Sequence, residues 1–364
     1  MMSDNYSVCV PFNNFHINAP FSGEITVNED KVKNIDIDFL QPEIYKEGMW
    51  INSSYVEILS NFQKLSSLSS IINTETFCRA IEEIANIEVT SATQKLRIVF
   101  NEIGRINSHL LVLGDMADIM YMDILCGEIM RQKDKISKLF YEMFGSRIFA
   151  SFNTVGGTLK ITRQMILKIK IIIKSIDDYF KGISEFFHED SAIKEALTGV
   201  GVLKDHKARI LGVTGPIAKA SGIDKDLRSE LYGVYAKEFR PIVFTAGDCY
   251  ARALVRVDEI IQSISLIYEM LENITLENIT LGEAENTLPA SSIGETLLRY
   301  EQSEGVSEIH VKLGGNGIIK KFILCTFRGN TVKAMKSALI DADLLDVPII
   351  MSSFNYCDCG MEVK

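Results

Sequence analysis

The chain has 364 residues, of which 47% are hydrophobic, so it can bury a core as one large domain or two without disulfide staples. Its formal net charge is −10, from 38 basic and 48 acidic residues. This balance argues against a nucleic-acid groove, which needs a basic footprint, and we expect no nucleic-acid partner.

Cysteine usage and hydropathy indicate a reducing, cytoplasmic setting. The cysteines are odd in number and form no dense framework: Cys9, Cys78, Cys126, Cys249, Cys325, Cys357 and Cys359. The opening MMSDNYSVCVPFNNF lacks the basic and apolar regions of a signal peptide. No window offers about 18 uninterrupted apolar residues, so we do not expect the chain to span a membrane by itself.

The first half of the chain predicts a hairpin followed by helices. Residues 23–39, GEITVNEDKVKNIDIDF, alternate around a polar NEDK centre and predict an antiparallel hairpin. Residues 74–87 carry apolar positions at helical spacing, and TSATQ then makes a break with a cap residue. From Ala92 to about Phe144 apolar residues recur every three or four positions, which predicts one or two long amphipathic helices.

The second half begins with another long helix, predicted over residues 159–187. Its KIKIIIK middle is compatible with a membrane-surface helix, but we favour a core helix whose lysines reach solvent. Residues 192–235 predict short elements broken by Gly and Pro, and residues 247–274 a further helix. SEIHVKLGGNGIIKKFILCTF then predicts a hairpin with a Gly-Asn-Gly turn, and because a strand follows the glycines they do not form a phosphate loop.

These elements predict a mainly α fold with small β elements (α+β). We expect an N-terminal β-hairpin region at 1–48, a long-helix core at 49–285, and a C-terminal β-hairpin region with a terminal Cys-x-Cys segment at 286–364. The alternating βα units of a dinucleotide-binding fold are absent from the pattern.

The helix expected from residue 92 contains RIVFNEIGRINSHLLVLGDMA, in which four polar residues interrupt core positions: Arg97, Glu102, Arg105 and His109. Glu102 and Arg105 are three apart and can pair, and His109 follows Arg105 by four on the same face. One such histidine alone is ordinarily a satisfied core residue. Four polar groups together indicate a helix that lies against something charged.

This stretch resembles the large subunit of membrane-bound, energy-converting nickel–iron hydrogenases and the homologous quinone-site subunit of respiratory complex I. Both families carry an E-x-x-R-I-x-S-H-L-x-x-L-G motif here. Three more blocks agree in the same order, at residues 199–228, 247–264 and 343–354. The resemblance runs from about residue 12 to the end and implies the helical core of that family, with β-hairpins at both ends.

In the hydrogenases, nickel and iron are held by two cysteines of an early R-I-C-G-I-C-x-x-x-H segment and two of a C-terminal D-P-C-x-x-C. KLSSLSSIIN (64–73) replaces the early segment, with these substitutions: Lys64 for the arginine, Ser66 and Ser69 for the cysteines, and Asn73 for the histidine. A serine hydroxyl stays protonated near neutral pH and does not replace a bridging thiolate.

At the C-terminus, FNYCDCG places Cys357 on the first ligand position and Gly360 on the second, with Cys359 out of register by one. We therefore expect no nickel–iron centre. The Cys-Asp-Cys is a relic or a structural tail, or else a new metal or redox site, for which two further ligands such as His310 and Cys78 are needed.

The complex I protein also lacks these cysteines and bonds its quinone through an N-terminal hairpin histidine and a tyrosine. His16 is the histidine retained in the first segment, and Phe77 stands at the tyrosine position, where a phenyl ring lines a cavity but donates no proton. An acceptor cavity with His16, Phe77 and Asn73 is therefore one alternative, and an ordinary loop role for His16 is the other.

By resemblance, the helix with Arg97, Glu102, Arg105 and His109 faces a small subunit that carries the proximal iron–sulfur cluster. His109 would couple electron transfer to protonation there, and Lys64 would keep a positive charge nearby. The open alternative for these residues is a buried ion-pair network that fixes a subunit interface.

The resemblance thus implies a hydrogenase-like large subunit, with its own metal site degenerate, in a redox-linked, ion-translocating oxidoreductase complex of the NADH dehydrogenase and hydrogenase superfamily. The expected partners are an iron–sulfur small subunit and a membrane-embedded complex I-like subunit, in a hetero-oligomer peripheral to the cytoplasmic face of the cell membrane. We expect no cofactor on the chain itself. The alternatives are an electron-accepting site for quinone or another small acceptor, and a non-redox scaffold subunit.

Overall fold

The computed structural model describes most of the chain: residues 6–9, 21–39, 48–64, 66, 68–148, 152–231, 239–272, 274, 279 and 288–355. His16, Cys357, Cys359 and Gly360 lie outside these described residues.

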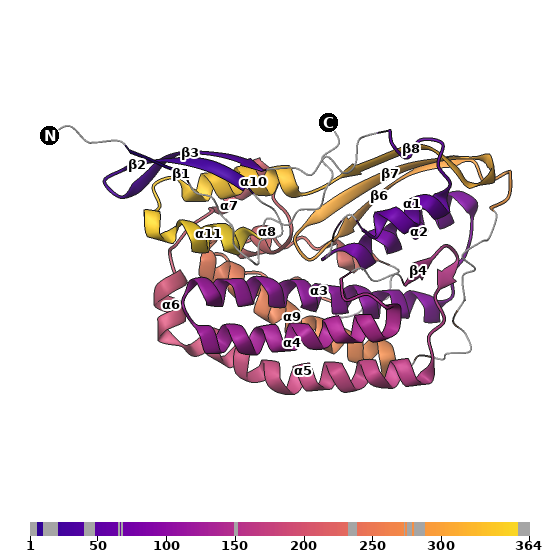
Figure 1. Cartoon of the computed structure of the whole chain (residues 1–364), viewed down its shortest axis with the longest axis horizontal. Helices are drawn as coiled ribbons and strands as arrows, with labels where there is room; N and C mark the ends of the chain where they lie inside the picture. Colours follow the sequence, from indigo (N-terminus) through magenta and orange to yellow (C-terminus); the bar gives the residue numbers. More distant parts are fainter. Residues whose placement is uncertain are drawn as a thin grey trace.

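Long helices form one layer of the molecule, drawn in the lower half of Figure 1. They are α3 (Ser91–Ile119), α4 (Asp123–Phe144), α5 (Arg163–Glu189) and α9 (Cys249–Glu272). α3 lies against both α4 and α9, and most of its side chains are buried, so it is the central helix of the fold. The chain leaves α4 at Gly145, whose φ of 74° is a left-handed cap.

α5 closes the layer with one apolar face. Ile166, Ile169, Ile173 and Ile176 recur at three and four positions and are buried, whereas the lysines between them are exposed. The core-helix interpretation of KIKIIIK is therefore confirmed for this face. The helix begins four residues later than expected because the two-stranded hairpin β4 (Asn153–Thr154) and β5 (Gly157–Thr158) precedes it.

The N-terminal sheet lies above one end of this layer (Figure 1). Its strands pair in the order β1 (Tyr6–Cys9), β2 (Phe21–Asn28), β3 (Lys31–Phe39), all antiparallel. The predicted hairpin is confirmed as β2–β3, and Glu29 and Asp30 make its two-residue turn with φ values of 50° and 60°. Beside this sheet lie the C-terminal helices α10 (Arg328–Leu339) and α11 (Val347–Phe354), the latter preceded by η5 (Leu344–Asp346).

The C-terminal sheet covers the other end, together with α1 (Tyr55–Phe62) and α2 (Ser70–Ala85). Its antiparallel order is β6 (Gly294–Glu301), β7 (Val306–Gly314), β8 (Ile318–Cys325), with η4 (Gly315–Gly317) as the expected Gly-Asn-Gly turn. The expected hairpin is confirmed as β7–β8. Strand β6 and helices α10 and α11 were not expected, so the C-terminal region is more than a hairpin.

Short elements connect α5 to α9 and approach the middle of the molecule: α6 (Ser191–Leu197), α7 (Asp205–Leu211), α8 (Gly215–Ala220) and η1 (Leu227–Glu230). Two large apolar clusters hold the helices and the sheets together. The main one joins the long helices to the inner side of β2–β3, and the second joins α1 and α2 to the sheet β6–β8. The mainly α, α+β fold class is confirmed. No helix in the described part of the chain is both long and apolar enough to cross a bilayer.

Candidate functional site

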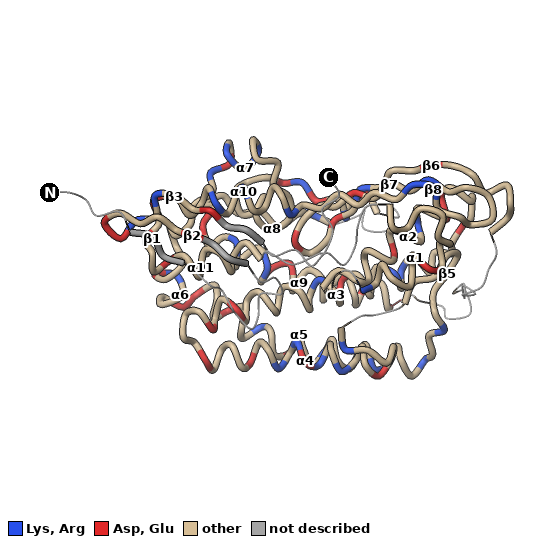
Figure 2. Tube along the Cα trace, turned by 45° about the horizontal axis from the view of Figure 1, so that its top comes forward, with Lys and Arg blue, Asp and Glu red and all other residues tan. Residues whose placement is uncertain are grey.

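Charged side chains gather in the centre of the molecule, where the two layers meet. Figure 2 shows acidic and basic residues along α3, α9 and the α8 segment as well as on the outer surfaces. α3 contributes Glu102, Arg105 and His109, each at most 5% exposed. α9 contributes Arg252, Arg256, Glu259 and Ser263, which recur at three and four positions and therefore share one face.

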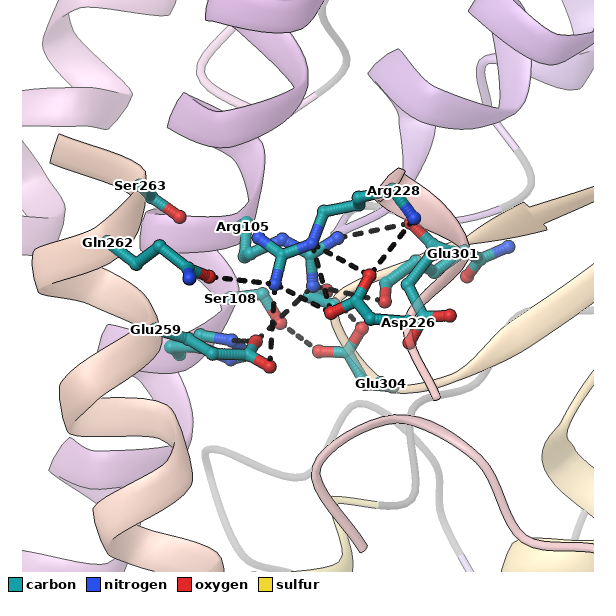
Figure 3. A network of polar contacts seen from close by, with 12 residues as sticks. Arg105, Ser108, Asp226, Arg228, Glu259, Gln262, Ser263, Glu301 and Glu304 are labelled. Carbon is teal, nitrogen blue, oxygen red and sulfur yellow. Dashed lines mark hydrogen bonds and ion pairs between the residues drawn. The ribbon is translucent and has the colours of Figure 1, made fainter. Parts of the chain in front are cut away.

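Segments far away in the sequence complete this network. Lys219 comes from α8, Asp226 and Arg228 flank the start of η1, and Glu301 and Glu304 lie at the turn after β6; all are buried. Figure 3 shows Asp226, Arg228, Glu301 and Glu304 converging with Arg105 and Glu259. We call the following buried residues the central network: Glu102, Arg105, Ser108, His109, Lys219, Asp226, Arg228, Arg256, Glu259, Ser263, Glu301 and Glu304.

Glu259 is the centre of the central network (Figure 3). Its Oε2 lies 2.8 Å from Nε2 of His109 and 3.4 Å from Nη1 of Arg105. Its Oε1 accepts a hydrogen bond of 2.6 Å from Nζ of Lys219 and lies 3.6 Å from Nη2 of Arg228. One carboxylate thus connects α3, α8, α9 and η1.

Asp226 and Glu102 hold the two sides of the Arg228 guanidinium. Asp226 accepts from Nη2 of Arg228 at 2.8 Å and from Nζ of Lys219 at 2.5 Å. Glu102 accepts from Nη1 of Arg228 at 3.1 Å and from the hydroxyl of Ser263 at 2.5 Å. Charge-assisted bonds of this kind are the strong ones, and they fix the η1 segment to α3 and α9.

The turn after β6 is held by the same network. Arg105 donates to the backbone carbonyls of Glu301 (3.1 Å) and Gln302 (3.2 Å). Glu304 accepts from the hydroxyls of Ser108 and Ser303, and from the amide of Asn355 at 2.9 Å. The end of α11 and the C-terminal sheet therefore meet α3 at this point.

Burial and neighbouring charges set the protonation states. Burial alone would raise the pKa of Glu259, but Lys219 and Arg228 outweigh it and hold that pKa well below its usual range. Burial would lower the pKa of Lys219, but Asp226 and Glu259 raise it instead. These groups therefore stay ionised as pairs.

Three members of the central network titrate differently. Burial lowers the pKa of His109, against the opposing hydrogen bond to Glu259, so the imidazole is neutral near pH 7. Nδ1 of that ring is buried and has no hydrogen-bond partner among the described residues. Burial also raises the pKa of Glu301, and it lowers that of Arg256 to about 10. These are the groups of the network whose charge is easiest to change.

Arg97 belongs to a separate buried pair. Its guanidinium meets both carboxylate oxygens of Glu82, at 2.6 and 2.8 Å, and also the carbonyls of Thr154 and Gly157. The backbone N–H of Gly156 donates to the same carboxylate at 2.8 Å. Arg97 thus ties α3 to α2 and to the β4–β5 hairpin.

The expected partner-facing set is largely buried within the chain, and its proximity to an iron–sulfur partner stays a prediction. Arg97, Glu102, Arg105 and His109 point into the chain's own interior, where each has a charged neighbour, and of the five residues assigned to that face only Lys64 is exposed. The buried ion-pair network, the alternative weighed for the same residues, describes their contacts.

The described positions of the former metal ligands are used for other contacts. The hydroxyl of Ser66 accepts from the backbone N–H of Ser69 at 3.2 Å, just before α2. Oδ1 of Asn73 accepts from the hydroxyl of Tyr300 at 2.8 Å and from the amide of Gln302 at 2.9 Å. Hydroxyls and an amide do not fit a nickel–iron centre, which needs thiolates.

Other candidate ligands do not complete a site. Among the residues that the structure describes, no group of three or more His, Cys, Asp or Glu side chains has the arrangement of a metal site. His310 pairs with Glu295 on the C-terminal sheet. Cys78 lies in the second apolar cluster, and burial raises the pKa of its thiol well above the usual value.

The alternative acceptor cavity with His16, Phe77 and Asn73 finds no open space at Phe77. The Phe77 ring is fully buried in the second apolar cluster, with its centroid 6.0 Å from that of Phe62 and 5.9 Å from that of Phe322. An aromatic core occupies the space that a small acceptor would need. A cavity of about 290 Å³ lies between α2, α3, η1 and β6 and has other walls.

Sequence reasoning missed the partners of the α3 residues. All five partners are at least a hundred positions away from α3, and no local spacing links them to it: Lys219, Asp226, Arg228, Glu259 and Glu301. One signal was present: ARALVRVDEIIQSI carries Arg252, Arg256, Glu259 and Ser263 on one face of a helix that is otherwise apolar. Charged residues on a buried face need charged partners.

A family described as "Respiratory-chain NADH dehydrogenase, 49 Kd subunit" matches residues 120–332. The chain is 31% identical to the C/D subunit of NADH-quinone oxidoreductase from Phocaeicola vulgatus, over 91% of this chain and 64% of that protein. It is 28% identical to the alpha subunit of the membrane-bound hydrogenase from Pyrococcus furiosus (87% and 78%), and 24% identical to a subunit of the F(420)H(2) dehydrogenase from Methanosarcina mazei (96% and 93%).

Coverage of the NADH-quinone oxidoreductase relatives is partial. The chain spans 44%, 64% and 60% of the length of three such proteins, from Bacteroides thetaiotaomicron, Phocaeicola vulgatus and Clostridium beijerinckii. The similarity to the two other kinds of relative covers most of both chains.

Proposed function

The chain belongs to the family of the 49 kDa subunit of respiratory-chain NADH dehydrogenase, and we propose that it is a hydrogenase-like large subunit without a nickel–iron centre. It would work in a membrane-associated, redox-linked, ion-translocating complex. Its relatives are named as subunits of NADH-quinone oxidoreductase, of F(420)H(2) dehydrogenase and of a membrane-bound hydrogenase, which supports a place in a hetero-oligomeric complex.

The observation that carries the metal-free part of the proposal is the use of Ser66 and Asn73. The Ser66 hydroxyl accepts a backbone hydrogen bond at the start of α2, and the Asn73 amide oxygen already accepts two side-chain hydrogen bonds. Oxygen ligands of this kind are hard and neutral, whereas nickel and iron in this family type need soft anionic sulfur. The chain itself would then bind no cofactor.

We propose that reduction of a partner's cluster is coupled to protonation within this chain by electrostatic interactions. A partner iron–sulfur protein would bring its cluster near the chain, with the exposed Lys64 on the side of the former metal segment. Gaining an electron adds negative charge, which raises the pKa of nearby groups and favours their protonation. His109, neutral and within hydrogen-bond distance of Glu259, is the member of the central network best suited to respond. A membrane-embedded partner on the cytoplasmic side would respond to this change in protonation.

Metal analysis of the complex isolated through this chain tests the proposal. We expect iron without nickel, together with an iron–sulfur subunit and a membrane subunit. Nickel in a one-to-one ratio with the chain would refute the metal-free assignment. A complex with neither metal would favour the second candidate, a non-redox scaffold, which the paired, buried contacts of Arg97 and Arg228 also suit.

A further inference from the structure

The cavity between α2, α3, η1 and β6 has a volume of about 290 Å³, near the lower end of small-molecule sites. Apolar side chains from three different elements form its walls: Ile71, Leu227 and Leu298. Asn101 and Arg105 of α3 and Gln302 after β6 supply buried polar atoms, and the exposed Glu230 and Arg299 also line it.

Asn101 is the unusual member of this lining. Its side chain is only 9% exposed, and both Nδ2 and Oδ1 are buried without a hydrogen-bond partner among the described residues. Oε1 of Gln302 is likewise without one. Buried polar atoms in proteins nearly always have partners, so several orphans around one cavity indicate that something else satisfies them.

The two buried arginines at the cavity are already paired within the chain. Arg228 is bonded to Asp226 and Glu102, and Arg105 lies between Glu102 and Glu259. A charged guest would find no unpaired buried counter-charge here, and burying an unpaired charge is costly. The occupant is therefore uncharged.

Hydrogen-bond chemistry narrows the chemical class of the occupant further. A primary amide offers a donor and an acceptor side by side, so Asn101 can make two parallel hydrogen bonds with a lactam or imide edge. Oε1 of Gln302 can accept from a further N–H. The apolar walls suit the faces of a flat ring.

We propose that this cavity binds a planar, uncharged heterocycle whose edge alternates carbonyl and N–H groups, with Asn101 as the recognising residue. This site differs from the acceptor cavity expected at Phe77, and it does not depend on the absence of a metal centre. It adds a small-molecule site to the subunit role proposed above.

The test is a titration of the full-length chain with three imide-edged probes of increasing size: uracil, lumazine and lumichrome. Binding is measured by calorimetry and by ligand-observed NMR. We expect at least one probe to bind with one-to-one stoichiometry. Duroquinone, a ring with carbonyls but no N–H, should bind at least about tenfold more weakly than that probe, because it cannot donate to Asn101.

Asn101→Leu should weaken binding of that probe by about tenfold or more, since both hydrogen bonds are lost. Gln94→Leu is the matched control: it is also an amide on α3 but lines a different groove, and affinity should be unchanged. Ile72→Phe, which narrows the cavity from α2 without altering Asn101, should also weaken binding. Thermal unfolding followed by circular dichroism checks that each variant is folded.

Three results would overturn the proposal. If no probe binds at millimolar concentration, the cavity holds only water. If binding survives both Asn101→Leu and Ile72→Phe, the probes bind elsewhere. If duroquinone binds as tightly as the imides, recognition does not use the amide edge. None of these results bears on the nickel content, so the proposed function and this site fail separately.

Discussion

Among single residues, Glu259 contacts four basic side chains of the central network. Its two oxygens serve Lys219, Arg228, Arg105 and His109, and the side chain is fully buried. Breaking a buried pair by removing one partner leaves the other charge uncompensated in a poorly polarisable interior. Removing the charge of Glu259 should therefore destabilise the fold mainly through the cations that remain unpaired, rather than through the hydrogen bonds that are lost.

Glu259→Gln should lower the free energy of unfolding by about 3–5 kcal/mol, because it keeps the shape but removes the charge. The measurement is urea unfolding at neutral pH. Asp258→Asn is the control on the same helix, since Asp258 pairs with His188 at 2.8 Å in a partly exposed position. It should cost less than about 1 kcal/mol. Equal small losses would mean that the central network adds little to stability.

His109 predicts a pH dependence. Burial lowers its folded-state pKa below the unfolded value of about 6.5, so below that pH the unfolded chain binds a proton that the folded chain does not. Stability from this residue is complete above about pH 6.5 and is lost as the pH falls. The stability advantage of wild type over His109→Gln should therefore shrink between about pH 7 and pH 5.

The measurement is the free energy of unfolding at several pH values in that window, for wild type, His109→Gln and a control. His206→Gln is the control because His206 is exposed on α7. Its difference from wild type should stay constant over the same window. A constant difference for His109→Gln as well would show that His109 takes up its proton equally in both states.

At the scale of elements, the start of α8 and the turn after β6 approach each other closely. Gly215 has a φ of 64°, and a Cβ there would lie 2.6 Å from the carbonyl oxygen of Glu304. The backbone N–H of Val306 donates to the Thr214 hydroxyl at 2.8 Å beside it. This contact positions Lys219 on one side and Glu304 on the other.

Gly215→Ala should therefore lower the free energy of unfolding by at least about 2 kcal/mol, from left-handed backbone strain and the backbone collision together. Gly127→Ala is the matched control: Gly127 is inside α4, and nothing lies within 4 Å of a Cβ there. It should stabilise by about 0.5–1 kcal/mol, as glycine is a poor helix former. Chemical denaturation measures both. A harmless Gly215→Ala would show that the turn can move away from α8.

The helices were predictable because their signal is local. Apolar residues at three and four positions located α3, α4, α5 and α9, and the NEDK and GNG turns located two hairpins. Strand β6 was missed because GETLLRYE carries only a weak alternation, and short α10 and α11 because their pattern is brief. The polar residues of α3 were recognised, but their partners within the chain were not, since these lie on α9 and on segments far along the chain.

At the scale of the whole molecule, the two apolar clusters are joined by polar bridges rather than by a continuous core. Arg97 and Glu82 link α3 of the main cluster to α2 of the second, and Arg105 holds the turn after β6. Trp50 is the chain's one tryptophan and lies in the second cluster, with its ring centroid 4.7 Å from that of Phe322. Its fluorescence therefore reports on that cluster, while ellipticity reports mainly on the long helices.

Because these bridges are buried and charge-paired, the Trp50 fluorescence and the far-ultraviolet ellipticity of wild type should change at the same urea concentration. Arg97→Met leaves Glu82 buried without its cation, so it should cost about 3 kcal/mol or more and make the Trp50 transition precede the ellipticity transition. Arg131→Met is the control, since Arg131 pairs with Glu128 on the exposed side of α4, and both transitions should remain together. Separate transitions already in wild type would mean that the bridges do not couple the clusters, and that the second cluster, which carries the former metal segment's helix α2, unfolds on its own.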